Sequence, residues 1–276
     1  MHHKTDTGKH NMFVAKSLRY FYLCCLLLLN VDSVASTAEQ KPLKDLTELQ
    51  LSAGEWPPFL SETLPHQGVV AHLLRDVFAE AGYKVSFTFL PWGRAYHDTN
   101  NGKYAATAVW MLSEDRTKDF MYSAPVLSEK FVFFHLKQRR FDWQNLTDLH
   151  GLLLGGGLGY SYGQAFDQAL ENKLFKMSRV GTTEQNFRRL AAGRIDVFAE
   201  EISVGYHTLN NQLPELADAI SHHHLPLLIN QSYLLFPKSN LDSAQIISQF
   251  NLHLEKFRQS GRYQSYFDLL KQGEYQ

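Results

Sequence analysis

Hydrophobic positions along the chain alternate between two spacings, which predicts a mixed α/β protein. Residues 69–81 repeat apolar side chains every three to four positions, as a helix does, whereas residues 84–90 follow a strand pattern. The same two spacings predict strands at 49–52, 105–110, 131–136, 150–155, 195–199 and 232–236, and helices at 92–100, 161–170, 187–192 and 242–260. The segment 138–143 has basic residues and no apolar pattern, and we interpret it as a crossing between two compact units.

The first 38 residues have the layout of a secretory signal peptide. Basic residues precede an apolar run at 20–29, and short polar and small side chains follow up to Ala38. A membrane-spanning helix needs about 20 apolar residues, so we expect residues 1–38 to be cleaved and the protein to lie in the periplasm. Both cysteines, Cys24 and Cys25, fall in this run, which predicts a mature chain without disulfide or thiolate chemistry.

The charge balance narrows the range of partners. The chain has 27 Lys and Arg residues against 28 Asp and Glu, a formal net charge of -1, and 44% hydrophobic residues. Such a chain has the composition of a globular protein and no field that attracts nucleic acid or an anionic membrane surface. We expect no nucleic-acid partner, and a monomer.

The stretch Gly159-Tyr160-Ser161-Tyr162-Gly163 matches the Gly-x-Ser-x-Gly motif of serine hydrolases. Asp196 with His222, His223, His224 or His253 could complete a catalytic triad, although Asp196 lies inside a predicted strand. The alternative is a glycine-rich turn with Ser161 as the N-cap of a helix whose free N–H groups bind an anion. The sequence favours this second interpretation.

Three adjacent histidines, His222–His224, suggest a metal site. Neighbouring residues of an extended segment point to alternate sides, so the three side chains cannot reach one ion. The sequence offers no second cluster of His, Cys, Asp or Glu at ligand spacing. We therefore expect neither a metal nor a cofactor.

Three tryptophans, Trp56, Trp92 and Trp110, each follow or end a predicted strand. The carboxyl ends of parallel strands form the edge at which α/β proteins bind ligands, so these residues predict a cleft with aromatic walls. Arg94 and Arg116 come just beyond two of these strand ends. An arginine at the mouth of such a cleft can hold a carboxylate through two hydrogen bonds.

From about Leu49 to the C-terminus the chain resembles the family 3 extracellular solute-binding proteins, the amino-acid-binding type that serves ABC importers. The resemblance is carried by the order and spacing of short segments: EWPPF at 55–59, GKY at 102–104, SEDRTK at 113–118, FMYSAP at 120–125, DLHG at 148–151, GYSY at 159–162, AGRID at 192–196 and GRY at 261–263. The resemblance implies a two-lobe periplasmic-binding-protein fold of type II with two hinge crossings. We expect residues 39–134 and 230–276 to form lobe 1 and residues 135–229 to form lobe 2.

The resemblance also implies which residues contact the ligand. Trp56 packs on it, Arg116 holds its carboxylate, Ser161 assists, and Glu201 receives its ammonium group. The expected ligand-binding set is Trp56, Phe59, Trp92, Arg94, Trp110, Met111, Arg116, Ser161, Tyr162 and Glu201. Met111 departs from the family, which tends to have Ser or Thr there to receive the ammonium, and this favours a ligand with more flat or apolar surface than an ordinary α-amino acid.

These observations predict a non-enzymatic periplasmic protein that captures a small carboxylate-bearing solute, an amino acid or a related compound. Lobe closure would then present the solute to a membrane ABC permease. Two alternatives remain open: a sensory module that passes the signal to a signalling protein, and a secreted serine hydrolase that uses Ser161.

Overall fold

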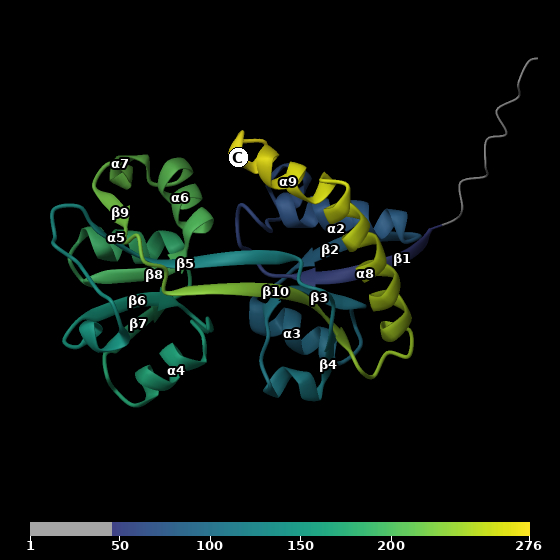
Figure 1. Cartoon of the computed structure of the whole chain (residues 1–276), viewed down its shortest axis with the longest axis horizontal. Helices are drawn as coiled ribbons and strands as arrows, with labels where there is room; N and C mark the ends of the chain where they lie inside the picture. Colours follow the sequence, from purple (N-terminus) through teal and green to yellow (C-terminus); the bar gives the residue numbers. More distant parts are fainter. Residues whose placement is uncertain (1–45) are drawn as a thin grey trace, which may run out of the picture. The chain divides into compact units, whose positions relative to one another are not determined.

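Ten strands form one continuous sheet across the described chain (Figure 1). The computed structural model describes residues 46–276, so the predicted signal peptide at 1–38 lies outside the described residues. Eight strands follow one another in the order β2-β1-β3-β10-β5-β8-β6-β7. Their bounds are Tyr83–Phe89, Thr47–Ala53, Ala106–Met111, Leu228–Pro237, Leu127–Leu136, Val197–Glu201, Leu153–Gly157 and Lys176–Val180, respectively.

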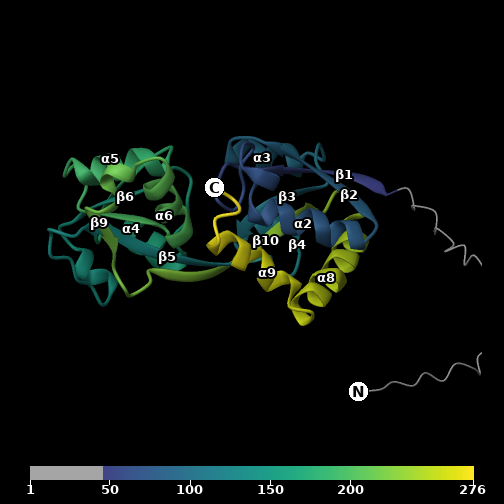
Figure 2. The same ribbon diagram turned by 90° about the horizontal axis from the view of Figure 1, so that it is seen from above.

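The sheet consists of two parallel halves joined by two long antiparallel strands. Strand β1 pairs in parallel with β2 and β3, and β6 pairs in parallel with β7 and β8. Strand β10 pairs with β3 and with the short β4 (Phe120–Tyr122), while β5 pairs with β8 and the short β9 (Ile220–His222). Because β5 and β10 also pair with each other, they connect two α/β lobes (Figures 1 and 2).

Helices cover both faces of each lobe (Figure 1). In the first lobe α2 (Val69–Glu80), α8 (Ser243–Gln259) and α9 (Arg262–Lys271) pack together, and α3 (Trp92–Asn100) lies on the other face of the sheet. In the second lobe α5 (Thr183–Ala191), α6 (Ile202–Asn211) and α7 (Pro214–Ala217) lie opposite α4 (Gln164–Glu171). Short 3-10 helices span Pro65–Gln67, Asp115–Lys118 and Leu146–Leu149.

The periodic apolar face predicted for residues 69–81 is the buried face of α2. Its fully buried side chains include Val70, Leu73 and Phe78, and the Phe78 ring lies 4.6 Å from that of Phe250 on α8. Burying a side chain of this size stabilises the fold by about 1.5–3 kcal/mol, so the stripe fixes how α2 packs.

The predicted crossing at residues 138–143 is wrong in its position. Residues 127–131 of β5 pair with β10, and residues 131–134 pair with β8, so the chain crosses within β5 itself. The segment 138–143 belongs to the second lobe, where Trp143 packs against Phe133 with ring centres 5.1 Å apart.

The start of the helix predicted at 161–170 is also corrected. Helix α4 begins at Gln164, and its N-cap is Gly163 with φ of 93°, a conformation that glycine adopts at little cost. Ser161 therefore precedes the helix and is not its cap. The strand predicted at 150–155 is β6, which begins at Leu153 because residues 146–149 form a 3-10 helix.

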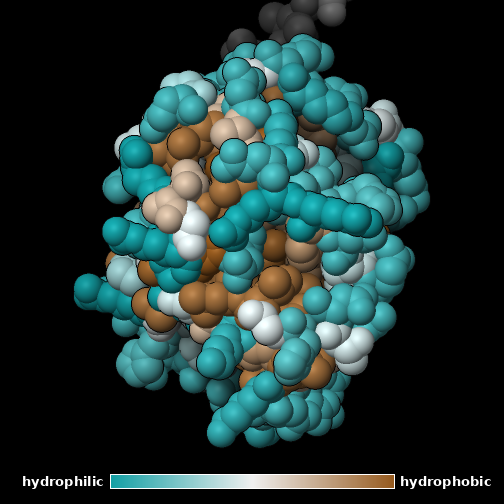
Figure 3. Space-filling model, turned by 90° about the vertical axis from the view of Figure 1, so that its left-hand side faces the viewer, coloured by the Kyte–Doolittle hydropathy of each residue, from teal (hydrophilic) through white to brown (hydrophobic). Residues whose placement is uncertain are grey.

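The end of the molecule that the second lobe forms has a mostly hydrophilic surface, with apolar patches between the polar side chains (Figure 3). Across residues 46–276 no helix is both long and apolar enough to cross a membrane.

Candidate ligand-binding site

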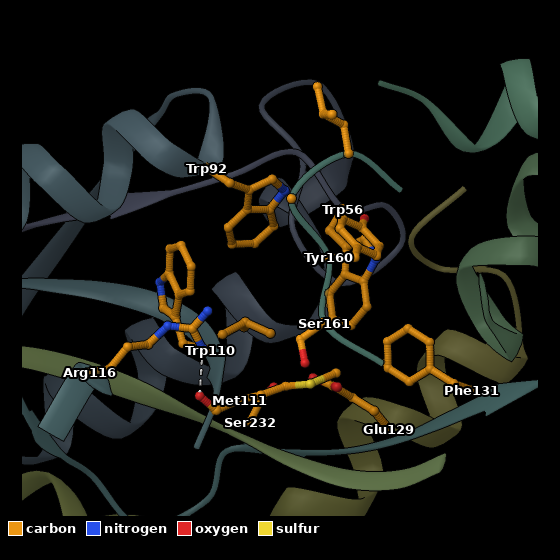
Figure 4. Close-up of a pocket in the computed structure, with 13 residues that line it drawn as sticks. Trp56, Trp92, Trp110, Met111, Arg116, Glu129, Phe131, Tyr160, Ser161 and Ser232 are labelled. Carbon is orange, nitrogen blue, oxygen red and sulfur yellow. Dashed lines mark hydrogen bonds between the residues drawn. The ribbon is translucent and has the colours of Figure 1, made fainter. Parts of the chain in front are cut away.

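A cavity lies where the two lobes meet at the crossing strands (Figure 4). Its lining comes from the first lobe, from the crossing strands and from the loop after β6. The residues are Trp56, Trp92, Val109, Trp110, Met111 and Arg116; Glu129, Phe131 and Ser232; and Leu158, Gly159, Tyr160 and Ser161. A second, larger cavity shares Trp56, Trp92, Leu158 and Tyr160 with it.

The aromatic walls lie at the carboxyl ends of parallel strands. Trp56 follows β1, Trp92 follows β2, and Trp110 lies near the end of β3. On the second lobe Tyr160 follows β6 in the same way, and Glu200 lies near the end of β8 in the lining of the larger cavity. The predicted convergence of the three tryptophans is therefore found, because parallel pairing brings these strand ends to one edge.

Two glycines allow aromatic rings to approach the sheet closely. A Cβ atom on Gly54, directly after β1, would lie 2.2 Å from Cε2 of Trp92. A Cβ atom on Gly157, at the end of β6, would lie 2.8 Å from the Tyr160 ring. Only glycine fits at these positions, so each ring is supported from beneath by the backbone.

A β-bulge in β3 positions Trp110. Two residues of β3 lie between Thr107 and Trp110, whereas one residue of β10 lies between their partners. The extra residue leaves Val109 with φ of 62°, which is unusual for a β-branched side chain and typical of functional sites. Trp110 Nε1 donates to Thr107 Oγ1 at 3.0 Å, and the Trp110 ring is nearly perpendicular to that of Trp92.

Arg116 is held at the cavity by two contacts. Its Nη1 donates to the carbonyl oxygen of Met111 at 2.9 Å, and its guanidinium carbon lies 4.9 Å from the centre of the Trp110 ring (Figure 4). A guanidinium has five N–H groups, so this bond leaves donors for a ligand. The arrangement suits a planar, negatively charged group.

Three other expected contacts do not line either cavity. Phe59 is 2% exposed and packs behind Trp56, with ring centres 5.0 Å apart. Tyr162 is buried, and its hydroxyl accepts from the Gly157 N–H at 2.7 Å. The Arg94 side chain is 64% exposed and pairs with Asp98. Phe59 and Tyr162 thus support the cavity wall, and Arg94 lies at the surface.

Glu201 is likewise absent from both cavity walls. Its Oε2 accepts from the backbone N–H groups of Ser203 and Val204 at 2.6 and 3.0 Å, which makes it the N-cap of α6. Its Oε1 lies 3.5 Å from the Lys130 backbone nitrogen. Burial raises the Glu201 pKa to about 7, against these hydrogen bonds. The chain itself uses this carboxyl group to cap α6, and neither cavity has Glu201 in its lining.

Two buried acids at the cavities were missed. Glu129 on β5 lines the smaller cavity, and Glu200 on β8 lines the larger one. Glu200 accepts from Thr183 Oγ1 at 2.8 Å and from the Glu201 N–H at 2.9 Å, and burial raises its pKa to about 8. The alternation of side chains along a strand could have indicated Glu200. Successive residues face opposite sides of the sheet, so only one of Glu200 and Glu201 can point to the ligand edge.

Ser161 lines the smaller cavity but has no catalytic partners around it. Its Oγ donates to Asp167 Oδ2 and accepts from the Gly163 N–H at 3.3 Å. Three of the residues proposed as partners are engaged elsewhere: Asp196 with Arg139, His222 with Tyr206, and His223 with Asp142. The arrangement that a Gly-x-Ser-x-Gly hydrolase requires is not assembled by these residues.

The ring centres of His223 and His224 lie 4.4 Å apart, against the expected alternation, but the three histidines do not form a metal site. His222 and His223 have the separate partners just given. In the part of the chain that the structure describes, no group of three or more His, Cys, Asp or Glu side chains could hold a metal ion.

Comparison with known proteins places the chain in a family. Residues 51–268 match the bacterial extracellular solute-binding proteins, family 3, and the chain belongs to this family. No curated protein sequence matches it.

Solved structures with the same fold include binding proteins and a receptor domain. An ancestral arginine-binding protein bound to arginine aligns with a TM-score of 0.66 at 18% identity, covering 81% of this chain and 98% of that one. The substrate binding protein of an amino acid ABC transporter aligns with a TM-score of 0.64 at 15% identity, covering 80% of this chain and 97% of that one. A histidine kinase sensor domain with similarity to periplasmic binding proteins aligns with a TM-score of 0.66 at 16% identity, covering 81% of this chain and 96% of that one. The fold is that of the two-lobe type II periplasmic binding proteins.

Proposed function

We propose that this protein is a periplasmic binding protein that captures a small carboxylate-bearing solute, an amino acid or a related compound, for a membrane ABC importer. Arg116 carries the proposal, because its guanidinium borders an aromatic-walled cavity between two lobes. A guanidinium binds a carboxylate through two parallel hydrogen bonds, and aromatic rings cover the apolar remainder of a small ligand. Family membership and the similar amino-acid-binding structures support this ligand class.

The proposed ligand contacts are the expected residues that line the cavity: Trp56, Trp92, Trp110, Met111, Arg116 and Ser161. The remaining lining residues, Tyr160 and Phe131 among them, enlarge the apolar wall. The protein binds the solute without changing it chemically.

Lobe closure is the proposed switch. Within the described residues, we assign 46–134 and 230–276 to the first lobe and 135–229 to the second, in keeping with the bounds expected from the sequence. The ligand contacts Arg116 on the first lobe and the loop around Ser161 on the second, so it favours a closed arrangement reached by torsion changes in β5 and β10. A permease recognises the closed form of a monomer that the signal peptide has directed to the periplasm.

A ligand screen tests the proposal. Amino acids, small organic acids, polyamines and short peptides are added to the exported protein at increasing concentration, and the unfolding temperature is recorded. A ligand at 100 times its Kd adds about 2.7 kcal/mol, which for a chain of this size raises the unfolding temperature by roughly 5–10 °C. Stabilisation by amino acids or related carboxylates supports the proposal, and stabilisation by polyamines alone contradicts it.

A sensory role is the second candidate, because a histidine kinase sensor domain has the same fold. An importer subunit and a sensor differ in the partner that recognises closure. Deleting the gene should abolish uptake of the radiolabelled ligand if the protein serves an importer. If uptake persists and a ligand-induced change in gene expression is lost, the protein is a sensor.

A further inference from the structure

Two buried polar atoms on the cavity wall have no hydrogen-bond partner within residues 46–276. They are Oε1 of Glu129 and Nε1 of Trp56, and their residues are 2% and 5% exposed. Leaving a buried polar group unpaired costs about 1–3 kcal/mol, and more if it is charged, so such groups in native proteins call for an explanation. The residues that line the cavity therefore include one unused acceptor and one unused donor.

Glu129 is positioned by the two crossing strands. It lies on β5 opposite Asn230 of β10, and its Oε2 accepts from Asn230 Nδ2 at 3.3 Å. Figure 4 shows it beside Ser232 and Met111 along one side of the cavity. Burial raises the pKa of its carboxyl group, an effect that the hydrogen bond from Asn230 only partly offsets. One oxygen is thus fixed to the hinge, and the other is free.

The neighbouring acids are not free in this way. Both oxygens of Glu200 accept hydrogen bonds, from Thr183 and from the Glu201 N–H. The oxygens of Glu201 accept from backbone N–H groups at the start of α6 and on β5. Glu129 alone among these three acids keeps an oxygen unpaired at the cavity.

We propose that Glu129 binds the cationic group of the ligand while Arg116 holds its carboxylate. The ligand is then zwitterionic: an amino acid, or a compound with the same two groups. This inference rests on the proposed binding function and names the ligand class of the same cavity. The role that the sequence assigned to Glu201 passes to an acid on the hinge strand.

The chemistry of the cavity supports this assignment. A cation next to Glu129 forms a charge-assisted hydrogen bond in a site shielded from water, where such bonds are strong. Trp56 and Phe131, whose ring centres are 6.4 Å apart, add aromatic faces near which a cation is stabilised. A carboxylic acid without the cation leaves Glu129 unpaired, so the site discriminates against it.

The test combines a substitution with matched ligands. Three sets of probes are built on leucine, phenylalanine and arginine; each set contains the amino acid, the acid lacking its α-amino group, and the amine lacking its carboxyl group. Kd values are measured by calorimetry for the exported wild-type protein and for Glu129→Gln. We expect the wild type to bind the amino acid of at least one set ten- to a hundredfold more tightly than the corresponding acid. In Glu129→Gln this ratio should fall to near one.

Glu201→Gln is measured in parallel and should keep the wild-type ratio. Glutamine keeps the shape of glutamate and is less costly to bury uncharged, so Glu129→Gln should unfold at the wild-type temperature or above. If Glu129→Gln does not fold, Glu129→Asp is used, which keeps the charge but draws it back from the cavity and should lower the ratio.

The outcomes separate this inference from the proposed function. If the amino acids and the corresponding acids bind the wild type equally, or if Glu201→Gln collapses the ratio and Glu129→Gln does not, the role of Glu129 is wrong and the carboxylate-binding function stands. If no probe of any set binds, the proposed function fails, and the inference fails with it.

Discussion

The guanidinium of Arg116 lies over the ring of Trp110, with 4.9 Å between the guanidinium carbon and the ring centre. The bulge at Val109 sets the direction of Trp110, and the Met111 carbonyl fixes one guanidinium N–H. A side chain held in this way loses little conformational freedom when it binds a ligand. The anion site is therefore built from three consecutive residues of β3 and one arginine beyond it.

Replacing Arg116 with alanine should weaken binding of a carboxylate ligand by roughly tenfold to over a hundredfold, because a hydrogen bond to a charged group is worth about 1.5–3 kcal/mol. Arg116→Lys should restore part of the affinity, since lysine keeps the charge but lacks the planar fork. Calorimetry with the ligand from the screen measures both. Arg94→Ala, at an exposed arginine away from the cavity, is the matched control; an equal loss in both alanine variants would contradict the role of Arg116.

Replacing Gly54 with alanine should displace Trp92, because the new Cβ would lie 2.2 Å from its ring. We expect a lower unfolding temperature, a shifted tryptophan emission spectrum and weaker ligand binding. Gly93→Ala is the control: it adds the same methyl group next to Trp92, where a Cβ meets no atom within 4 Å in the described chain. Gly93 lies in helix α3, where alanine is more stable than glycine by about 0.5–1 kcal/mol, so this control should not lower the unfolding temperature. Unchanged properties of Gly54→Ala would show that Trp92 does not approach Gly54 closely.

Burial of Glu200 should make the unliganded protein less stable as the pH rises. Its pKa is raised from 4.5 to about 8, so between these values the folded protein binds more protons than the unfolded chain. This contribution to stability is complete below pH 4.5 and is lost as the pH rises through about 8. Urea unfolding of the wild type and Glu200→Gln at pH 5 and pH 8 checks this. The wild type should lose more stability than the variant, and parallel losses would exclude Glu200 as the cause.

Ser161 should not react as a nucleophile. Its hydroxyl donates to Asp167, an acceptor that does not remove the serine proton as a histidine would. We expect no stoichiometric labelling of the exported protein by a fluorophosphonate and only a modest loss of ligand affinity in Ser161→Ala. Labelling that disappears in Ser161→Ala would restore the hydrolase hypothesis.

Ligand binding should make the protein more compact. Torsion changes confined to β5 and β10 move one lobe against the other, so the radius of gyration from small-angle X-ray scattering should decrease at saturating ligand. Arg116→Ala at the same ligand concentration should show a smaller decrease. Identical profiles with and without ligand for the wild type would leave the import mechanism without its switch.

Elements that bury one regular face could be predicted from the sequence alone. Helix α2, strands β1 to β3 and the long helix α8 have apolar periodicities that only one kind of element satisfies, and their predicted bounds agree with the structure within a few residues. The order of these elements also placed Trp56, Trp92 and Trp110 at one edge, because parallel strands with helical crossovers all present their carboxyl ends together. Short strands such as β7 and β9 were not predicted, since they are defined by their sheet partners and lack an apolar stripe.

Only the tertiary structure decided which acid is free to meet a ligand. The family resemblance implied that Glu201 contacts the ligand, but its Oε2 accepts from two otherwise unpaired backbone N–H groups in the first turn of α6. Glu129 had no motif around it, and its place at the cavity depends on how β5 crosses between the lobes and pairs with Asn230 of β10. A carboxyl group becomes available or occupied through contacts between segments far apart in sequence, and a pattern of neighbouring residues does not contain that information.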